Sequence, residues 1–258
     1  MNRVYITGDL HGEARYIEDF IHYNYDTHSF DYSDTIILLG DSGLNYYLNE
    51  KDTFFKAQLA ALPITFFVIR GNHEERAENI AKKYPDKWHE ETFFDNRVWV
   101  ENDFSNIKYA IDWPAIYTIN GMTTLVYPGA YSIDKEYRLM RGWKWFSEEQ
   151  LNEEEKIMGS LMADLYADKT DLVLSHTAPR EFEPKDLFLN FINQSKVDKS
   201  MEDYLQTIHE KVNYKLWCWG HYHADRIYPP REDGKMQAMF FHTIKNLEDF
   251  MKNLEKML

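Results

Sequence analysis

The chain has 258 residues, of which 44% are hydrophobic, and carries a formal net charge of −14. Such acidity argues against a general nucleic-acid binder, although bound cations can still attract a phosphorylated substrate locally. The lone cysteine, Cys218, excludes an internal disulfide, and no apolar run approaches the roughly 18 residues of a membrane span. With no secretory segment at the N-terminus, we expect a cytoplasmic protein without membrane association. No linker-like stretch divides the chain, so we expect a single domain over residues 1–258.

Five short runs of apolar and β-branched residues predict strands of an α/β core, because continuous apolar character is typical of strands covered on both faces. These runs occupy residues 4–6, 35–39, 64–69, 172–174 and 216–219. A short polar box follows each run, and the boxes are Gly8-Asp9-Leu10-His11-Gly12, Gly40-Asp41, Gly71-Asn72-His73-Glu74, Ser175-His176-Thr177 and Gly220-His221-Tyr222-His223. Ligands of open α/β sheets bind at one edge, so we expect the boxes to converge there.

Between these strands, apolar residues at helical spacing predict helices over residues 13–23, 51–62 and 74–83. Residues 97–127 instead predict short strands at 98–100, 115–119 and 123–126, with an Asn120-Gly121 hairpin turn. Ser147 as N-cap, with Gln150 in the capping box, predicts a further helix to about Ala167.

An insertion over residues 179–215 separates two of the boxes. Its loop contains Phe182, Phe188 and Phe191, and a helix is expected over residues 199–212. Because the loop begins beside the box at His176, it is either one wall of a substrate cleft or surface decoration. A C-terminal helix is expected over residues 246–258 and should pack on the core.

The boxes combine carboxylate, amide and imidazole groups, which together favour a metal centre. Asp9 and His11 are separated by one residue and follow a predicted strand, so both can reach the same ion. Asp41 supplies a carboxylate that could bridge two ions. The other candidate ligands are Asn72, His176, His221 and His223. Oxygen and nitrogen ligation without thiolate suits Mn²⁺, with Fe, Zn²⁺ or Ni²⁺ as alternatives, and excludes an iron–sulfur cluster.

The order Asp-x-His, Gly-Asp, Gly-Asn-His-Glu, His, Gly-His-x-His resembles that of the calcineurin-like metallophosphoesterases, in particular small bacterial and phage members. The resemblance implies an α/β fold with a central β-sandwich flanked by α-helices and a dinuclear metal site at the strand ends. It implies that one divalent ion is held by Asp9, His11, Asp41 and His223. It implies that the second is held by Asp41, Asn72, His176 and His221, so that Asp41 is the bridge.

The same resemblance gives His73 the catalytic role, either protonating the leaving group or stabilising the phosphoryl charge. Glu74 would cap or orient the loop. The serine/threonine phosphatase branch has Gly-Asp-x-x-Asp-Arg, in which the second Asp orients the catalytic His and the Arg holds phosphate. Here Leu44 and Asn45 occupy those two positions. Asn45 could still bind the substrate or His73.

Residues 129–146 also resemble a stretch found in small bacterial and phage members. Arg138 and Arg141 are candidates for binding the phosphate, because a guanidinium offers a planar fork of donors. For either arginine alone, a solvated or salt-bridged role is the alternative. Asp134 could pair with one of them or orient His73.

We therefore expect a metal-dependent enzyme that hydrolyses phosphate mono- or diesters through a metal-bridging hydroxide. Its substrate would be a small phosphorylated molecule, a nucleotide or a phosphopeptide. The alternative is a Ser/Thr protein phosphatase, which the run from Arg70 to Glu74 favours and Leu44 and Asn45 oppose. A non-catalytic scaffold with the same fold is a third possibility, which the complete set of expected ligands opposes.

Overall fold

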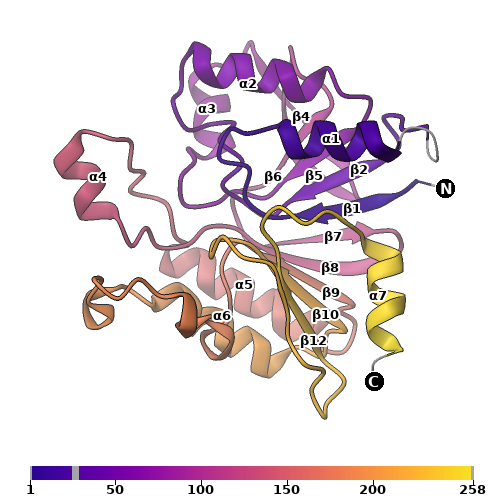
Figure 1. The fold of residues 1–258 in the computed structure, drawn as a ribbon, viewed down its shortest axis with the longest axis vertical. Coiled ribbons are helices and arrows are strands. Elements are labelled where there is room, and N and C mark those ends of the chain that lie inside the picture. Colours follow the sequence, from indigo (N-terminus) through magenta and orange to yellow (C-terminus); the bar gives the residue numbers. More distant parts are fainter. Residues whose placement is uncertain (1, 25–28, 257–258) are drawn as a thin grey trace.

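The computed structural model describes residues 2–24 and 29–256, and these residues form two β-sheets (Figure 1). In spatial order, the seven-stranded sheet contains β13 (Lys245–Asn246), β1 (Val4–Thr7), β2 (Thr35–Leu38), β3 (Thr65–Val68), β6 (Ile107–Ala110), β5 (Asn96–Glu101) and β4 (Trp88–Phe93). The six-stranded sheet contains β11 (Arg226–Ile227), β12 (Met236–Met239), β10 (Leu216–Trp219), β9 (Leu172–Ser175), β8 (Met122–Tyr127) and β7 (Ala115–Ile119). In both sheets the central strands are parallel and antiparallel strands lie at the edges.

Helices cover the outer faces of both sheets (Figure 1). The seven-stranded sheet is covered by α1 (Arg15–Asn24), α2 (Glu50–Ala60) and α3 (Ala77–Lys83), and the six-stranded sheet by α5 (Glu153–Tyr166) and α6 (Ser200–Lys211). The other helical segments are α4 (Lys135–Arg141), α7 (Leu247–Glu255) and the 3₁₀ turns η1 (Arg180–Phe182), η2 (Lys185–Leu187) and η3 (Gln194–Lys196). None of the described helices combines the length and the apolar character that a bilayer crossing requires.

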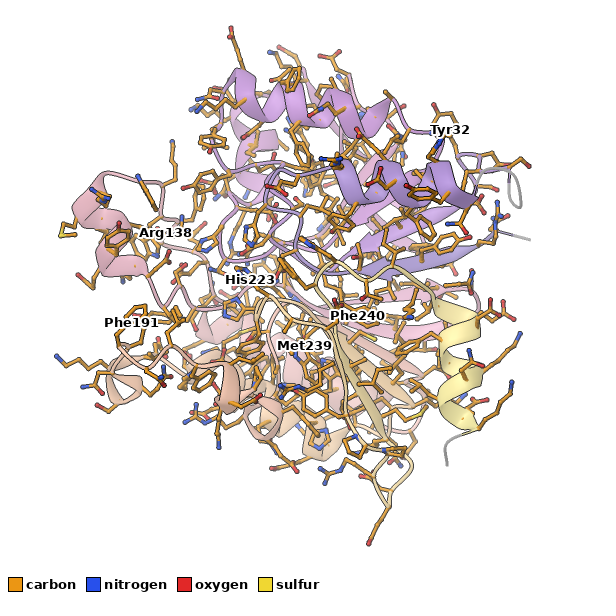
Figure 2. All side chains as sticks on the ribbon, in the orientation of Figure 1. Tyr32, Arg138, Phe191, His223, Met239 and Phe240 are labelled. Atoms are coloured by element: carbon orange, nitrogen blue, oxygen red, sulfur yellow. The ribbon has the colours of Figure 1, made fainter. Side chains whose placement is uncertain are left out.

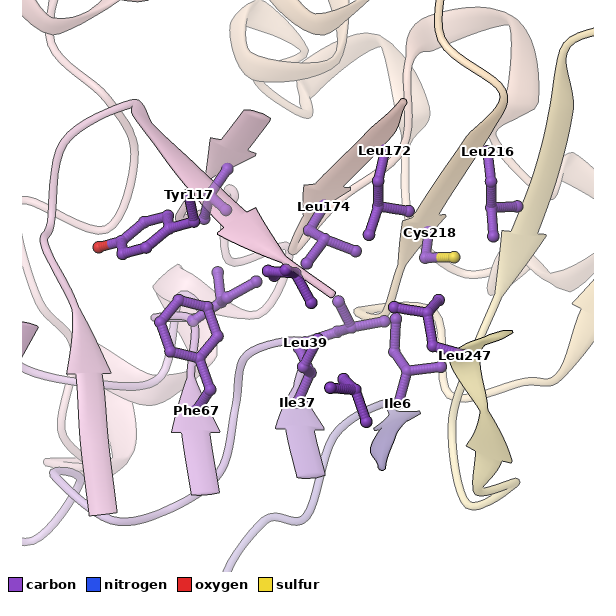
Figure 3. Close-up of a cluster of buried hydrophobic side chains, with 14 of the residues drawn as sticks. Ile6, Ile37, Leu39, Phe67, Tyr117, Leu172, Leu174, Leu216, Cys218 and Leu247 are labelled. Carbon is purple, nitrogen blue, oxygen red and sulfur yellow. The ribbon is translucent and has the colours of Figure 1, made fainter. Parts of the chain in front are cut away.

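The inner faces of the two sheets pack against each other through a core of aliphatic and aromatic side chains (Figure 3). Along β2, Ile37 points into this core, whereas Ile36 and Leu38 point to the helices on the other face. Both sets of side chains are therefore buried, which explains why the strand sequences are apolar throughout. Cys218 lies in the same inner core, where burial raises the pKa of its thiol, as expected for a structural cysteine.

The expected sandwich of two sheets between helices is confirmed, and so is the Asn120-Gly121 hairpin. Both turn residues have left-handed backbone angles, with φ of 50° for Asn120 and 77° for Gly121, as a type I′ turn requires. The turn joins β7 to β8 and places Ile119 opposite Met122.

The predicted start of the fourth helix is wrong. Helix α5 begins at Glu153, and its N-cap is Asn152, whose Oδ1 accepts a hydrogen bond from the Glu155 backbone N–H at 3.0 Å. The Glu155 carboxylate in turn accepts from the Asn152 N–H at 2.8 Å. Ser147 lies outside the helix, and the side chain of Gln150 donates to Asp198 at 3.1 Å.

Smaller differences concern other helix ends. Helix α3 begins at Ala77 and not at residue 74, because the Glu74 side chain is turned back to the loop after β2. Helix α7 ends at Glu255, and the last two residues of the expected helix lie outside the described residues.

Candidate metal centre

The polar boxes after β1, β2, β3, β9 and β10 meet where the two sheets adjoin. The link between the sheets is direct: His176, which follows β9, has its Nδ1 2.6 Å from the carbonyl oxygen of Leu39, which follows β2. Likewise, the backbone N–H of His221, which follows β10, donates to both oxygens of Asp9 at 3.0 and 3.1 Å. The convergence expected from the sequence is therefore present.

One group of potential ligands consists of Asp9, His11 and His223. Each offers one ligand atom, and these atoms all lie within 4.8 Å of one another. The Nε2 atoms of His11 and His223 are 2.8 Å apart, and Nε2 of His223 is 3.8 Å from Asp9 Oδ2. One carboxylate and two imidazoles at this spacing can share a single divalent cation.

A second group surrounds His176. Its Nε2 lies 2.9 Å from Asn72 Oδ1 and 3.6 Å from Asp41 Oδ1, and its ring centroid is 5.0 Å from that of His221. Donation from Nδ1 to the Leu39 carbonyl fixes the orientation of the ring, so that Nε2 faces the amide and carboxylate oxygens. Burial would lower the pKa of His176, but Asp41 and Asp9 raise it to about 9, so the ring must release its Nε2 proton to bind a cation. Such a backbone contact behind a histidine is typical of metal ligands.

Glycine is needed before these side chains for steric reasons. A Cβ on Gly40 would lie 2.1 Å from Nδ1 of His176, and one on Gly71 would lie 2.1 Å from Oδ1 of Asp41. Gly40 also has φ of 97°. The boxes thus contain glycine because the strand ends approach the ligand side chains of neighbouring loops very closely.

Several of the ligand candidates have left-handed backbone conformations themselves. These are His11 (φ 49°), Asp41 (φ 45°), His221 (φ 71°) and His223 (φ 50°). This conformation is uncommon for residues other than glycine and tends to cluster at functional sites. Here it accompanies the turns that direct four ligand side chains toward one place.

Two carboxylates of the site are fully withdrawn from water. Asp9 is 0% exposed and Asp41 is 2% exposed. Within residues 2–24 and 29–256, their ion pairs involve only histidines: His176 and His223 for Asp9, and His73 and His176 for Asp41. Buried carboxylates without a lysine or arginine partner are costly unless cations compensate them. Their burial thus fits a site for divalent metal ions.

The protonation states of three imidazoles and of Asp41 fit metal ligation as well, whereas burial raises the pKa of Asp9 well above its ordinary value, so Asp9 must lose a proton to bind a cation. Burial lowers the pKa of His11, lowers that of His223 to about 4, and lowers that of His221 well below its usual range, so all three rings are neutral with free lone pairs. Burial would raise the pKa of Asp41, but the imidazoles of His73 and His176 hold it well below its ordinary value. Asp41 is therefore ionised, as a ligand must be.

Comparison with known proteins identifies the family of this chain. Residues 2–225 match the family described as calcineurin-like phosphoesterase. The chain belongs to the calcineurin-like phosphoesterase family. Metal-dependent phosphoester hydrolysis is the activity of this family, and its members generally depend on a dinuclear metal centre. No curated protein matches the sequence.

Solved structures with a similar overall arrangement share little sequence with this family member. Phosphopantetheinyl hydrolase (PptH) from Mycobacterium tuberculosis is 12% identical, with a TM-score of 0.47, over 93% of this chain and 90% of that chain. The protein of unknown function AQ665 from Aquifex aeolicus is 15% identical, with a TM-score of 0.39, over 88% and 82%. GAP50, the anchor in the inner membrane complex of Plasmodium, is 11% identical, with a TM-score of 0.48, over 93% and 71%.

His73 lies beside the candidate ligands of this phosphoesterase-family protein and contacts both Asp41 and Arg138. Its backbone N–H donates to Asp41 Oδ1 at 2.8 Å, and its ring Nε2 lies 3.0 Å from Nη2 of Arg138. Arg138 also donates from Nη1 to the Tyr46 hydroxyl at 3.1 Å and from Nε to both oxygens of Asp134 at 2.8 Å. The structure thus brings Arg138 to the site, with Asp134 as its partner.

Two other candidates for substrate binding lie elsewhere. Arg141 is exposed, and its Nε donates to the Tyr137 hydroxyl at 3.0 Å on the outer side of α4. Asn45 is buried and lines a separate cavity of about 370 Å³ between α2 and α3, together with Lys56 and Trp88. Leu44, at the position of the phosphatase-branch Asp, is fully buried in the core under α1 and α2.

A hydrogen-bonded network of side chains supports Asn72 and was not predicted from the sequence. Asn72 Nδ2 donates to Ser132 Oγ at 2.9 Å, and Ser132 Oγ donates to Glu149 Oε2 at 2.5 Å. Glu149 also accepts from the indole of Trp145 at 2.8 Å. The network orients the amide so that its oxygen faces His176. Ser132 lies in the stretch that resembles other family members, but nothing in the sequence pairs it with Glu149 or Asn72, so only the tertiary structure identifies this network.

A second hydrogen-bonded network, which the sequence did not predict, joins the loop after β9 to the loop after β10. Thr177, next to His176, donates to Glu202 Oε1 of α6 at 2.9 Å, and the Tyr222 hydroxyl, from the box with His221 and His223, is 3.1 Å from Thr177 Oγ1. Glu202 is 2% exposed, and burial raises its pKa to about 7, although Lys199 acts in the opposite direction. Glu202 thus holds the loops after β9 and β10 together from behind.

The raised pKa of Glu202 predicts how stability depends on pH. The folded protein keeps this proton up to about pH 7, whereas the unfolded chain releases it near the ordinary value of 4.5, so the carboxyl costs stability as pH rises between these values. We expect wild type to lose up to roughly 3 kcal/mol relative to Glu202→Gln between pH 5 and pH 8. Urea unfolding at both pH values measures this difference. Glu210→Gln, on the exposed face of the same helix, is the matched control, and parallel curves for wild type and Glu202→Gln would contradict the expectation.

Proposed function

We propose that this protein hydrolyses phosphate mono- or diesters with two divalent cations, of which Mn²⁺ is the favoured metal. One cation would be held by Asp9, His11, Asp41 and His223. The other would be held by Asp41, Asn72, His176 and His221. The observation that carries the proposal is the burial of Asp9 and Asp41 without a lysine or arginine partner in the described chain, beside imidazoles held neutral.

When bound, a pair of cations lowers the pKa of a water between them and stabilises negative charge on the phosphoryl oxygens. The protein's own residues would orient the ester. Arg138 can hold a phosphoryl oxygen through its guanidinium. Its Nη2 also lies 3.0 Å from Nε2 of His73 and orients the ring, which in its imidazolium form can give a proton to a leaving alkoxide.

The pairing of Asp134 with Arg138 bears on the alternative function, a Ser/Thr protein phosphatase. That branch places its Asp and Arg at the positions of Leu44 and Asn45, which here lie in the core and in a separate cavity. In this chain the guanidinium of Arg138, on α4, contacts His73, and the carboxylate of Asp134, just before α4, holds that guanidinium. The site would thus obtain its carboxylate and its guanidinium from the segment around α4 and not from the loop after β2. For this reason we favour a small phosphorylated substrate over a phosphoprotein. The single buried cysteine is in keeping with a cytoplasmic location.

A substrate panel tests the proposal directly. Metal-free protein is reconstituted with Mn²⁺, Fe²⁺, Zn²⁺ or Ni²⁺ and assayed with mono- and diester model compounds, nucleotides and phosphopeptides. We expect turnover with at least one ester class and its loss on addition of a chelator. If the reconstituted protein binds metal but hydrolyses no member of the panel, the non-catalytic scaffold becomes the better description.

We expect Asp41→Asn to reduce metal content and turnover together. The amide keeps the shape of the side chain but removes the negative charge that would offset two neighbouring cations. Metal content is measured by mass spectrometry, and folding by near-ultraviolet circular dichroism. Asp19→Asn, on the exposed face of α1, is the control and should retain its metals and activity. Full metal content and activity in Asp41→Asn would exclude Asp41 as the bridge.

We expect His73→Ala to spare the metals and lower kcat by about 10²–10⁴-fold, because the backbone N–H that donates to Asp41 remains. The loss should be smaller for esters with good leaving groups, such as p-nitrophenyl phosphates, which need no proton. An equal loss for leaving groups of very different pKa would show that His73 holds the phosphate and does not protonate the leaving group.

We expect Arg138→Lys to lower kcat/KM by about 10–100-fold, because a hydrogen bond to a charged group contributes about 1.5–3 kcal/mol and an ammonium cannot reproduce the planar fork. The separate values of kcat and KM show whether the contact tightens in the transition state. Arg141→Lys is the matched control on the same helix and should behave like wild type. Equal kinetics for both variants would remove Arg138 from the substrate site.

A further inference from the structure

The candidate metal centre opens into a cavity of about 560 Å³. Two segments that project on the same side of the molecule border it: the α4 arm, residues 131–146, and the insertion loop, residues 183–199 (Figure 1). Figure 2 shows Arg138 on the first segment and Phe191 on the second, with His223 nearer the body of the protein. The cavity therefore extends well beyond the ligand residues, and it has the size typical of a site for a small organic molecule.

The wall that the two segments contribute is partly apolar, and its polar residues are Asp134, Arg138, Gln194, Asp198 and Lys199. Its apolar and aromatic residues are Tyr131, Ile133, Leu187, Phe188, Leu189 and Val197. The same cavity is lined by the candidate ligands His11, Asp41 and His223. A phosphoryl group at the cations would thus leave the rest of its molecule against hydrocarbon.

The charged side chains of this wall already have partners. Lys199 donates to Glu183 at 2.5 Å, and Asp134 accepts from Arg138 at 2.8 Å. Asp198 accepts from the side chain of Gln150 at 3.1 Å and from the backbone N–H of Ser200 at 2.8 Å. Binding the hydroxyl groups of a sugar to these three charged side chains would compete with their contacts, whereas an apolar group would leave them intact. Glu202 also lines the cavity, and its Oε2 has no hydrogen-bond partner within the described residues.

The two segments also expose apolar side chains, of which Ile133, Leu187 and Leu189 line the cavity. On the α4 arm the exposed side chains are Ile133, Tyr137, Leu139, Met140 and Trp143, and on the insertion loop Leu187, Leu189 and Phe191. Met140 is 74% exposed and Phe191 is 81% exposed. Single exposed apolar residues are ordinary, but a group of them around a cleft is typical of a surface that binds a ligand.

We propose that the cavity binds the organic group of the substrate and that this group is apolar, so that the substrate is a phosphoester of an alkyl or aryl alcohol. The proposal rests on the proposed function and names its substrate class. Its physical basis is the continuity of the apolar part of the wall with the ligand residues in one cavity. Burying hydrocarbon there removes apolar surface of both the substrate and the two segments from water.

Binding of n-alkylphosphonates to the Mn²⁺-loaded protein tests this without turnover, because a phosphonate has no ester bond to hydrolyse. We expect the Kd from titration calorimetry to fall by about fourfold for each methylene that is buried, from methyl- through propyl- to hexylphosphonate. A Kd that does not depend on chain length would overturn the proposal.

Variants locate the effect in the cavity. Ile133→Ala and Leu187→Ala remove apolar surface from the two segments and should each reduce the dependence of Kd on chain length. Leu165→Ala removes a 70% exposed leucine from α5 and is the matched control, with a dependence equal to that of wild type. A dependence that is the same in all three variants would place the alkyl chain elsewhere and overturn the proposal.

Hydrolysis of the corresponding alkyl phosphates separates this proposal from the proposed function. Hydrolysis of methyl, propyl and hexyl phosphate with equal kcat/KM, together with a flat phosphonate series, would overturn the substrate class and leave the function standing. Tighter binding of longer phosphonates without hydrolysis of any ester would overturn the function and leave the apolar binding site standing.

Discussion

The organisation of the site depends on two carboxylates, Asp9 and Asp41, that are buried together without a lysine or arginine beside them in the described chain. A buried charge costs several kcal/mol unless another charge or a set of hydrogen bonds compensates it. Here backbone N–H groups of His73 and His221 and the ring of His176 supply part of that compensation. The remaining requirement for positive charge is what makes the site suitable for divalent cations.

The double-sheet architecture meets this requirement because it brings strand ends from two sheets to one place. The Asp9 and Asp41 loops belong to one sheet, and the His176 and His221 loops belong to the other. Contacts from His176 to Leu39 and from His221 to Asp9 join them directly. Any shift of one sheet against the other would therefore separate the ligands, so the packing of the inner core also sets the geometry of the site.

Behind the ligands, two hydrogen-bonded chains hold the loops in position. Glu149 and Ser132 orient Asn72, while Glu202 joins the loops after β9 and β10 through Thr177. Mutation of such contacts behind a ligand set typically lowers metal affinity or activity by about 10–100-fold. The side of the site that faces solvent is built differently, from the α4 arm and the insertion loop, and these two segments would distinguish one substrate from another.

Local patterns were enough to predict the five strands, the hairpin at Asn120 and Gly121, and the convergence of the boxes, because each depends on a short stretch and on the general geometry of parallel sheets. The start of α5 could not be predicted, since Ser147 and Asn152 both resemble an N-cap and the local sequence does not decide between them. The same limit applies to the arginines. Arg138 and Arg141 lie three residues apart on one helix, and only the packing of α4 against the loop of His73 turns the first inward and leaves the second in water. Residue types and their order therefore specify the chemistry, whereas contacts between distant segments decide which side chains take part in it.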